Sequence, residues 1–275
     1  FDLMGQIEPF SSMSSYVSEH SVNVTIMLLI TMGGLGFWVL NDIYKAKKLK
    51  YLSVHTKIVL ISSAVLILGG TGLFLLWEHS NDATLGLLSH GDKVIAAMFQ
   101  SITARTAGFN SISQTGLTEQ SRALMIILML IGGSPGSTAG GIKTVTAVVL
   151  LLSAYASLKG KHEVSVMGRK ISSAQIMNAL ALFVFAIVTV IVSTLAISTI
   201  ESIPFGDVLY ETSSAFGTVG ISMGITPTLG AVSRIILILI MFMGRIGVLT
   251  MGYIVLARKR DRANIEYPDA NLMIG

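Results

Sequence analysis

The sequence contains no cysteine and few charged residues. Without cysteine the chain can form neither a disulfide nor a thiolate metal site. Charged residues make up 12% of its 275 residues, whereas soluble globular proteins carry about 25%. So small a charged fraction leaves too little polar surface to cover a water-soluble domain of this size. The composition therefore argues against an ordinary soluble domain and favours a protein that lies in lipid.

Long apolar runs are present instead, and hydrophobic residues make up 52% of the chain. A helix needs about 20 apolar residues to cross the hydrocarbon core of a bilayer. Four runs reach that length and are predicted to be transmembrane helices: 22–44, 54–77, 176–199 and 232–257. The predicted fold class is therefore an all-α integral membrane protein.

Three further apolar segments do not fit a single uninterrupted span. The stretch 122–157 is apolar at both ends, but a run of small residues from Gly132 to Gly141 interrupts it. The segments 94–104 and 205–216 are too short to cross a bilayer. We expect these two segments to enter the membrane and turn back, or to lie at its surface.

The basic residues predict the orientation of the spans. They form three groups, whereas the loops between these groups carry Glu and Asp with few cations. The positive-inside rule places the three groups, and with them the C-terminus, in the cytoplasm. The net charge of +4 is then an orientation signal rather than a nucleic-acid-binding patch. The groups are Lys45, Lys47, Lys48, Lys50 and Lys57; Lys159, Lys161, Arg169 and Lys170; and Arg258, Lys259, Arg260 and Arg262.

An internal repeat relates two parts of the chain at a constant offset in residue number. An offset of 112 (218 − 106) places the tripeptide 106–108, Thr-Ala-Gly, on the tripeptide 218–220, Thr-Val-Gly. It also places Gly132 on Gly244, and the spacing from the loop glycine is 24 in both copies (132 − 108 and 244 − 220). Together with the placement of Lys57 on Arg169, three features agree at one offset, which is much stronger evidence of a repeat than one tripeptide alone.

Each repeat is predicted to contain a span, a loop that enters and leaves the membrane, and a second span. The same offset places Lys57 on Arg169, at the inner start of the first span of each unit. A glycine-containing core recurs in the second span, and it appears once more at Gly33 and Gly34. We therefore expect 22–44 to be the second helix of an earlier unit.

The repeated Thr-x-Gly loop suits the binding of a monovalent cation. Non-helical backbone at membrane depth is tolerated only where protein buries it or water lines it. Several such loops around an axis would aim backbone carbonyls at one point and replace the hydration shell of an ion. Glycine permits the backbone conformations that this requires. The plainer alternative, glycines that only allow close helix packing, is less favoured because the loop is repeated.

Two motifs resemble the Trk/Ktr/HKT superfamily of potassium transporters. They are 103–110, Thr-Ala-Arg-Thr-Ala-Gly-Phe-Asn, and the long, specific 132–144, Gly-Gly-Ser-Pro-Gly-Ser-Thr-Ala-Gly-Gly-Ile-Lys-Thr. The resemblance covers essentially the whole chain. It implies four helix–pore loop–helix units in one chain around a pseudo-fourfold pore. It also implies potassium uptake across a membrane rather than enzymatic activity.

The family pattern divides the chain into four parts. Phe1 then lies just after the filter glycine of a second unit, and we expect Asn/Thr-Ala-Gly directly before it. The parts are 1–53, the end of the second repeat; 54–165, the third repeat with its broken helix; 166–257, the fourth repeat; and 258–275, a cytoplasmic tail.

The resemblance also implies roles for particular residues. With one glycine per loop, instead of the Thr-Val-Gly-Tyr-Gly of potassium channels, we expect weaker discrimination of potassium from sodium. The implied selectivity-filter residues are Thr106, Ala107, Gly108, Thr218, Val219 and Gly220. The implied gate residues are Gly132, Gly133, Ser134, Pro135, Gly136, Ser137, Thr138, Ala139, Gly140, Gly141, Lys143 and Arg245.

Partners and location follow from the same resemblance. It implies a homodimer in the plasma membrane that rests on a cytosolic ring of nucleotide-binding regulatory subunits of the KtrA/TrkA type. No cofactor is expected in this chain; potassium is the substrate, and sodium dependence is left open. The tail, with Tyr267, Pro268, Ile274 and Gly275, resembles the KtrB branch more than the TrkH branch, and in KtrB this end packs at the dimer interface.

Four polar residues near the implied pore allow more than one role. Arg245 is either a pore-facing barrier to cations or a contact that holds two helices together; we favour the barrier. Arg105 is expected to support its loop from behind, because a cation in the pathway would repel potassium. Lys143 either meets carbonyls of the broken helix or extends to the inner surface. Glu211 either attracts cations or braces its loop.

Two transport mechanisms remain open from the sequence. One is a gated pathway driven by the membrane potential, and the other is a symporter coupled to sodium or protons. No carboxylate lies in the centre of a full span, which favours the first. A non-conducting scaffold would not need two matching filter loops. A phosphate-binding P-loop is excluded, because Ile142 separates Gly141 from Lys143.

Overall fold

The computed structural model describes residues 12–46, 48–161 and 163–246, which fold into helices and one short hairpin. The α-helices are α1 (His20–Leu35), α2 (Phe37–Ala46), α3 (Val54–Glu78), α4 (His90–Thr103), α5 (Glu119–Leu130), α6 (Thr144–Leu158), α7 (Ser173–Glu201), α8 (Phe205–Gly217) and α9 (Ala231–Ile246). The 3-10 helices are η1 (Ser14–Tyr16), η2 (Leu49–Tyr51) and η3 (Thr226–Thr228), and β1 (Ser165–Val166) pairs with β2 (Arg169–Lys170) in antiparallel fashion.

Two helices of the described chain are long and apolar enough to cross a membrane by themselves. They are α3 and α7, which confirms the spans predicted at 54–77 and 176–199. α9 agrees with the predicted span 232–257 as far as Ile246, beyond which the prediction lies outside the described residues. α4 and α8 are short helices, at the places predicted for the two segments that cannot span.

The prediction of one continuous helix over 22–44 is wrong. α1 and α2 meet at an angle of 93° on either side of Gly36, whose φ of +81° ends the first helix. The cause lies elsewhere in the chain, because a side chain on Gly36 would come within 2.9 Å of the carbonyl oxygen of Pro135. The interrupted segment therefore packs directly against the bend.

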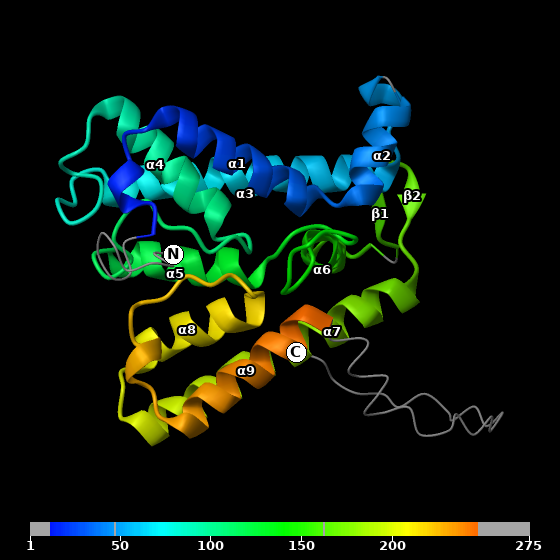
Figure 1. Cartoon of the computed structure of the whole chain (residues 1–275). Coiled ribbons are helices and arrows are strands. Elements are labelled where there is room, and N and C mark those ends of the chain that lie inside the picture. Colours follow the sequence, from blue (N-terminus) through cyan, green and yellow to red (C-terminus); the bar gives the residue numbers. More distant parts are fainter. Residues whose placement is uncertain (1–11, 47, 162, 247–275) are drawn as a thin grey trace.

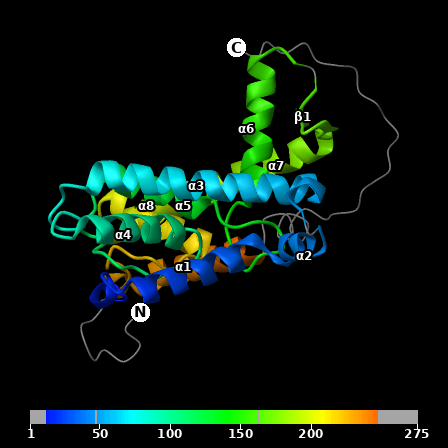
Figure 2. The same cartoon turned by 90° about the horizontal axis from the view of Figure 1, so that it is seen from above.

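The helices are arranged with the short ones inside. α1, α3, α7 and α9 run along the long direction of the molecule, and α4, α5 and α8 lie between them (Figures 1 and 2). Every residue of α8 from Tyr210 to Gly217 is buried, whereas α3 exposes Leu68 and Leu76 at 69% and 71%. Apolar side chains on the outer faces of α3 and α7 are what lipid contact requires.

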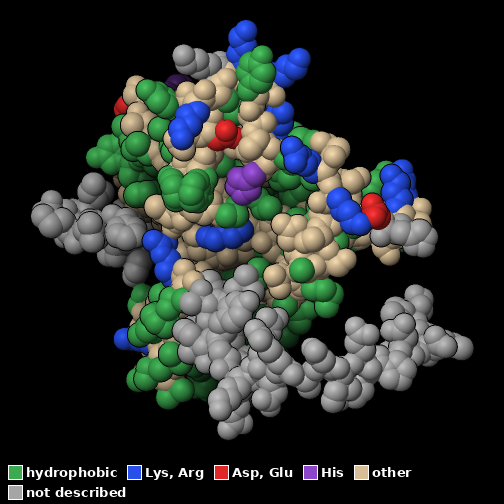
Figure 3. All heavy atoms as spheres, turned by 90° about the vertical axis from the view of Figure 1, so that its right-hand side faces the viewer, with side chains coloured by type: hydrophobic (Ala, Val, Ile, Leu, Met, Phe, Trp, Pro, Cys, Tyr) green, Lys and Arg blue, Asp and Glu red, His purple; other side chains and the backbone are tan. Residues whose placement is uncertain are grey.

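The two ends of the molecule differ in charge. Figure 3 looks onto the end where α3 and α7 begin, and Lys and Arg side chains gather there. The acidic residues Glu78 and Glu201 lie at the opposite ends of these helices. Basic and acidic residues thus lie at opposite ends of the molecule, as the positive-inside rule requires. The assignment of the basic end to the cytoplasm stays a prediction. The third basic group, Arg258 to Arg262, and the tail lie outside the described residues.

Candidate ion pathway

The two Thr-x-Gly loops have matching backbone conformations. Each follows the C-terminal end of a short buried helix, α4 or α8. φ is positive at Thr106 and Gly108, +69° and +84°, and again at Thr218 and Gly220, +52° and +95°. Positive φ is uncommon outside glycine, and for threonine it is a strained conformation. Its recurrence at the repeat offset indicates that the two loops are equivalent structures.

The two loops lie against each other through their backbones. A Cβ atom on Gly108 would lie 2.4 Å from the carbonyl oxygen of Val219. A Cβ atom on Gly220 would lie 3.7 Å from the Cα of Gly108. Glycine at 108 is therefore required both by its conformation and by space. The C-terminal ends of α4 and α8, which carry partial negative charge, precede these loops.

The loop after α4 is held in place from within and from behind. The hydroxyl of Thr103 donates to the carbonyl oxygen of Phe109 at 2.6 Å. Arg105 is 8% exposed, and its Nη2 donates to Oγ of Ser63 on α3 at 3.2 Å. The guanidinium thus links the loop to α3.

The loop after α8 is held by its own helix. The carbonyl oxygen of Ser214 accepts from the backbone N–H of Val219 at 2.9 Å, and its hydroxyl accepts from Gly220 at 3.2 Å. Glu211 is 6% exposed, and its carboxylate accepts a hydrogen bond from Ser222 in the returning chain. Glu211 therefore braces the segment that leaves the loop.

A buried polar network joins the two short helices. Gln114 donates to Oε1 of Gln100 on α4 at 3.1 Å, and its own Oε1 accepts from the hydroxyl of Tyr210 on α8 at 2.8 Å. Gln100 also donates to Ser111 at 3.3 Å. All four residues are buried. The network fixes the distance between the helices that present the loops.

The interrupted segment between α5 and α6 closes on itself and lies against the loop that follows α8. The N–H of Gly132 donates to the carbonyl of Ile142 at 2.8 Å, and the N–H of Ile142 donates to Leu130 at 3.0 Å. A Cβ atom on Gly140 would lie 2.3 Å from Oγ1 of Thr218. Only a segment with glycine at this position can approach the loop so closely.

The same segment is tied to the break between α1 and α2. The N–H of Ser134 donates to the carbonyl of Gly34 at 2.9 Å, and the N–H of Phe37 donates to Gly136 at 3.3 Å. The hydroxyl of Ser134 donates to the carbonyl of Leu35. The free carbonyls at the end of α1 therefore find their partners in the interrupted segment.

Two basic side chains hold neighbouring carbonyls of this segment. Nη1 of Arg245 on α9 donates to the carbonyl of Thr138, and Nζ of Lys143 donates to the carbonyl of Ala139. The backbone of Gly141 also donates to the carbonyl of Gly244 at 3.3 Å. Of the two roles left open for Lys143, its contact with the broken helix is the one present. Arg245 links α9 to the segment.

Two carboxylates that the sequence did not single out have equivalent roles in the two units. Glu78, the last residue of α3, accepts from the N–H and the hydroxyl of Thr118 at 2.9 and 2.7 Å. Glu201, the last residue of α7, accepts from the N–H of Gly230 at 2.9 Å and from Ser233 at 2.5 Å. Each carboxylate thus caps the start of the second helix of its unit, α5 or α9. Thr118 and Gly230 are related by the repeat offset (230 − 118 = 112). This relation in the sequence could have indicated that the two positions have equivalent roles.

The proposed equivalence of Lys57 and Arg169 is wrong. Lys57 lies in the first turn of α3, and Arg169 lies in β2 before α7 begins. The residue numbers of Glu78 and Glu201 differ by 123 (201 − 78), which exceeds the repeat offset of 112. The connection between the end of the first helix and the filter loop is therefore longer in the earlier unit. The repeat offset holds from the short helix onward and not before it.

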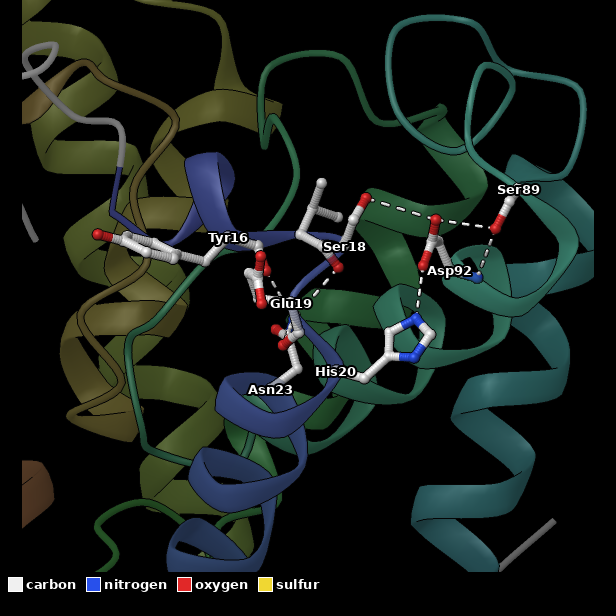
Figure 4. A network of polar contacts seen from close by, with 8 residues as sticks. Tyr16, Ser18, Glu19, His20, Asn23, Ser89 and Asp92 are labelled. Carbon is white, nitrogen blue, oxygen red and sulfur yellow. Dashed lines mark hydrogen bonds and ion pairs between the residues drawn. The ribbon is translucent and has the colours of Figure 1, made fainter.

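A polar network joins α1 to α4 at the end of the molecule opposite the basic residues (Figure 4). Nε2 of His20 and Oδ1 of Asp92 lie 2.6 Å apart, and Ser89 donates to Oδ2 of Asp92 at 2.8 Å. The hydrogen bond with His20, followed by that with Ser89, lowers the pKa of Asp92 below its ordinary value. Within the described residues, no three His, Asp or Glu side chains are grouped as a metal site.

Comparison with known proteins gives consistent matches. A family model described as TrkH, a cation transport protein, matches residues 6–266. The chain is 40% identical over 264 residues to the Ktr system potassium uptake protein B of Bacillus subtilis, covering 96% of this chain and 59% of that protein. It is 36% identical over 280 residues to the potassium/sodium uptake protein NtpJ of Enterococcus hirae, covering 100% of this chain and 61% of that protein.

A solved structure shares the fold. The potassium transporter TrkH from Vibrio parahaemolyticus superposes with a TM-score of 0.72 at 19% identity, over 90% of this chain and 54% of that one. At this identity the likeness concerns the fold alone. The chain spans about three fifths of the length of the curated relatives named above, at 59% and 61%.

Proposed function

Because this chain belongs to the TrkH family of cation transport proteins, we propose that it carries two pore units of a potassium uptake protein. The family comprises transporters and not enzymes. In this proposal 54–165 and 166–257 are the third and fourth of four units around a pseudo-fourfold pore, and 1–53 is the end of the second. A cytoplasmic tail follows at 258–275. The matching conformation of the loops at 106–108 and 218–220 is the observation that carries the proposal.

The filter is proposed to consist of backbone carbonyls from the Thr-x-Gly loops. The close approach of Gly108 to the carbonyl of Val219 supports this, because backbone rather than side chains occupies the space between the two loops. Carbonyl dipoles at such a point replace the water around a potassium ion. Arg105, which donates to Ser63 of α3, and Glu211, which accepts from Ser222, are proposed to hold the loops in position.

The gate is proposed to be the interrupted segment 132–143 with Arg245. Its contact with Thr218 supports a place directly beside the filter. Arg245 and Lys143 each hold one carbonyl of the segment, which favours a closed arrangement fastened by two cations. Movement of the segment away from α9 would require the hydrogen bond from Arg245 to break, whereas the bond from Lys143 lies within the segment.

The assembly is proposed to be a homodimer in the plasma membrane, with its C-terminus in the cytoplasm, bound to a nucleotide-binding regulatory subunit. The names of the relatives, which describe a Ktr system, support a further component. The chain itself is proposed to need no cofactor, with potassium as its substrate.

The driving force is proposed to be the membrane potential, which supplies about 2.3 kcal/mol per charge per 100 mV. Coupling to sodium or protons is the second candidate, and the potassium/sodium name of one relative favours keeping it. Potassium flux into liposomes that contain the intact transporter distinguishes them. Flux that follows the potential, and is indifferent to sodium and pH gradients, supports the first. Flux that needs either gradient supports the symporter, and no flux contradicts both.

A further inference from the structure

A cavity of about 300 Å³ lies between α3, α6 and the β1–β2 hairpin. Ile58 and Ile61 of α3, Leu152 of α6 and Met167 of the hairpin contribute to its walls. α6 leaves the body of the molecule where it meets α3 (Figure 2), so the cavity occupies the corner between the two helices. Its walls come from the half of α3 that is nearer the basic end.

The cavity opens onto the surface that faces lipid. Two of its lining residues, Val65 of α3 and Leu151 of α6, are 63% and 71% exposed. α3 is one of the helices that can cross a membrane. An apolar cavity at this depth suits a hydrocarbon chain, because a polar solute would lose its hydration there without gaining hydrogen bonds.

Both ends of the interrupted segment reach the cavity. Ile131, which precedes the segment, and Thr144, which follows it, contribute to the lining. Thr144 is 1% exposed, and its hydroxyl has no hydrogen-bond partner among the described residues. A molecule in the cavity therefore touches the two points at which the segment joins its helices.

Basic side chains lie next to the cavity in the chain. Lys57 directly precedes Ile58, and Arg169 follows Met167 by two positions. Nζ of Lys57 donates to a backbone carbonyl, that of Lys50, at 3.1 Å, so its charge is not neutralised. Arg169 is exposed and has no ion-pair partner in the described part of the chain, whereas its neighbour Lys170 pairs with Glu163.

We propose that this cavity binds one acyl chain of an anionic phospholipid, with the headgroup phosphate beside Lys57 and Arg169. The acyl chain lies in the apolar cavity, and the side chains of Lys57 and Arg169 bind the negatively charged phosphate. The site is distinct from the pore loops, and it adjoins the interrupted segment only at Ile131 and Thr144.

Fluorescence quenching by brominated lipids tests the site in the intact transporter. Leu151→Trp is made in a background whose other tryptophans are replaced by phenylalanine. Leu68→Trp is the matched control, since Leu68 is 69% exposed and does not line the cavity. Brominated phosphatidylglycerol is expected to quench L151W at a mole fraction at least about fivefold lower than brominated phosphatidylcholine does. L68W is expected to respond equally to the two lipids.

Two results would overturn the proposal. One is equal quenching of L151W by both lipids, which means ordinary contact with the bilayer. The other is protection of L151W from both lipids, which means that a second copy or another segment fills the cavity.

The headgroup contact has its own test. Lys57→Gln combined with Arg169→Gln is expected to remove the preference for phosphatidylglycerol. Each of the two charges is expected to account for about a fivefold preference in mole fraction. Lys48→Gln, an exposed lysine on the same side of the molecule, is expected to leave it unchanged. A preference that survives the double substitution contradicts the assignment of the headgroup. Quenching needs no ion flux, so these outcomes are independent of the proposed transport function.

Discussion

At the scale of single residues, Arg245 is the side chain whose contact bears most directly on the proposed gate. Its hydrogen bond to the carbonyl of Thr138 fastens the interrupted segment to α9. The side chain is exposed, so the bond contributes about 1 kcal/mol, which corresponds to roughly a fivefold change in an equilibrium. Arg245→Ala is therefore expected to increase potassium flux by about fivefold in proteoliposomes.

Arg234→Ala provides the control for this substitution. Arg234 lies on the same helix and donates to a backbone carbonyl, that of Pro227, at 2.8 Å, but at the other end of α9. Its removal is expected to leave flux unchanged. If Arg245→Ala lowers thermal stability without raising flux, Arg245 holds the helices together and does not restrain a gate.

Asp92 predicts a dependence of stability on pH. Its hydrogen bonds with His20 and Ser89 lower its pKa in the folded state. The stabilisation is therefore fully present above the ordinary carboxyl pKa of about 3.9 and is lost as the pH falls through the lower folded value. The thermal stabilities of the wild type and of Asp92→Asn are expected to differ at pH 6, and the difference is expected to shrink as the pH falls below about 3.9. A constant difference over that range contradicts this prediction.

The residue scale also shows a limit of prediction from sequence. Glycine at 108 and 220 was expected, because a Thr-x-Gly loop needs a conformation that glycine adopts readily. The positive φ of Thr106 and Thr218 was not expected, because nothing in the residue type favours it. Hydrogen bonds within each loop and the contact between loops impose that conformation.

At the scale of elements, Glu78 and Glu201 join the first helix of each unit to the second. Glu78→Gln and Glu201→Gln each place an amide donor against groups that already donate. We expect Glu78→Gln to lower the free energy of unfolding by roughly 1–3 kcal/mol, and Glu201→Gln to change it in the same direction. Glu119→Gln, whose side chain is 85% exposed, is expected to change it by less than about 1 kcal/mol. Thermal unfolding in detergent measures all three, and equal effects would contradict the capping role.

The elements divide into those that local sequence specifies and those that it does not. The lengths of α3 and α7 follow from apolar runs, and the end of α5 follows from the run of small residues that begins at Gly132. The bend at Gly36 was missed because its cause, the segment 134–136, is remote from it in the chain. The capping by Glu78 was missed for the same reason, since its partner Thr118 belongs to a different helix.

At the scale of the whole molecule, the arrangement of α3 to α9 fits the proposal of two neighbouring pore units. α4 and α8 are the buried helices, and the long apolar helices surround them. Basic residues lie at one end and the capping carboxylates at the other. Composition predicted this organisation well, because lipid contact and the positive-inside rule act on the whole chain. Composition does not encode how the two loops meet, which depends on the pairing of Gly108 with Val219.

The central claim is that the two Thr-x-Gly loops form part of the potassium filter, and Gly108→Ala tests it most directly. The added methyl group meets the carbonyl of Val219 at 2.4 Å in a backbone conformation with φ of +84°. Gly91→Ala is the control, because a methyl group there meets nothing within 4 Å. The measurement is the ratio of potassium to sodium flux through the intact transporter in proteoliposomes. We expect G108A to lower this ratio by about tenfold or more and G91A to leave it unchanged. An unchanged ratio in a folded G108A protein would contradict the claim.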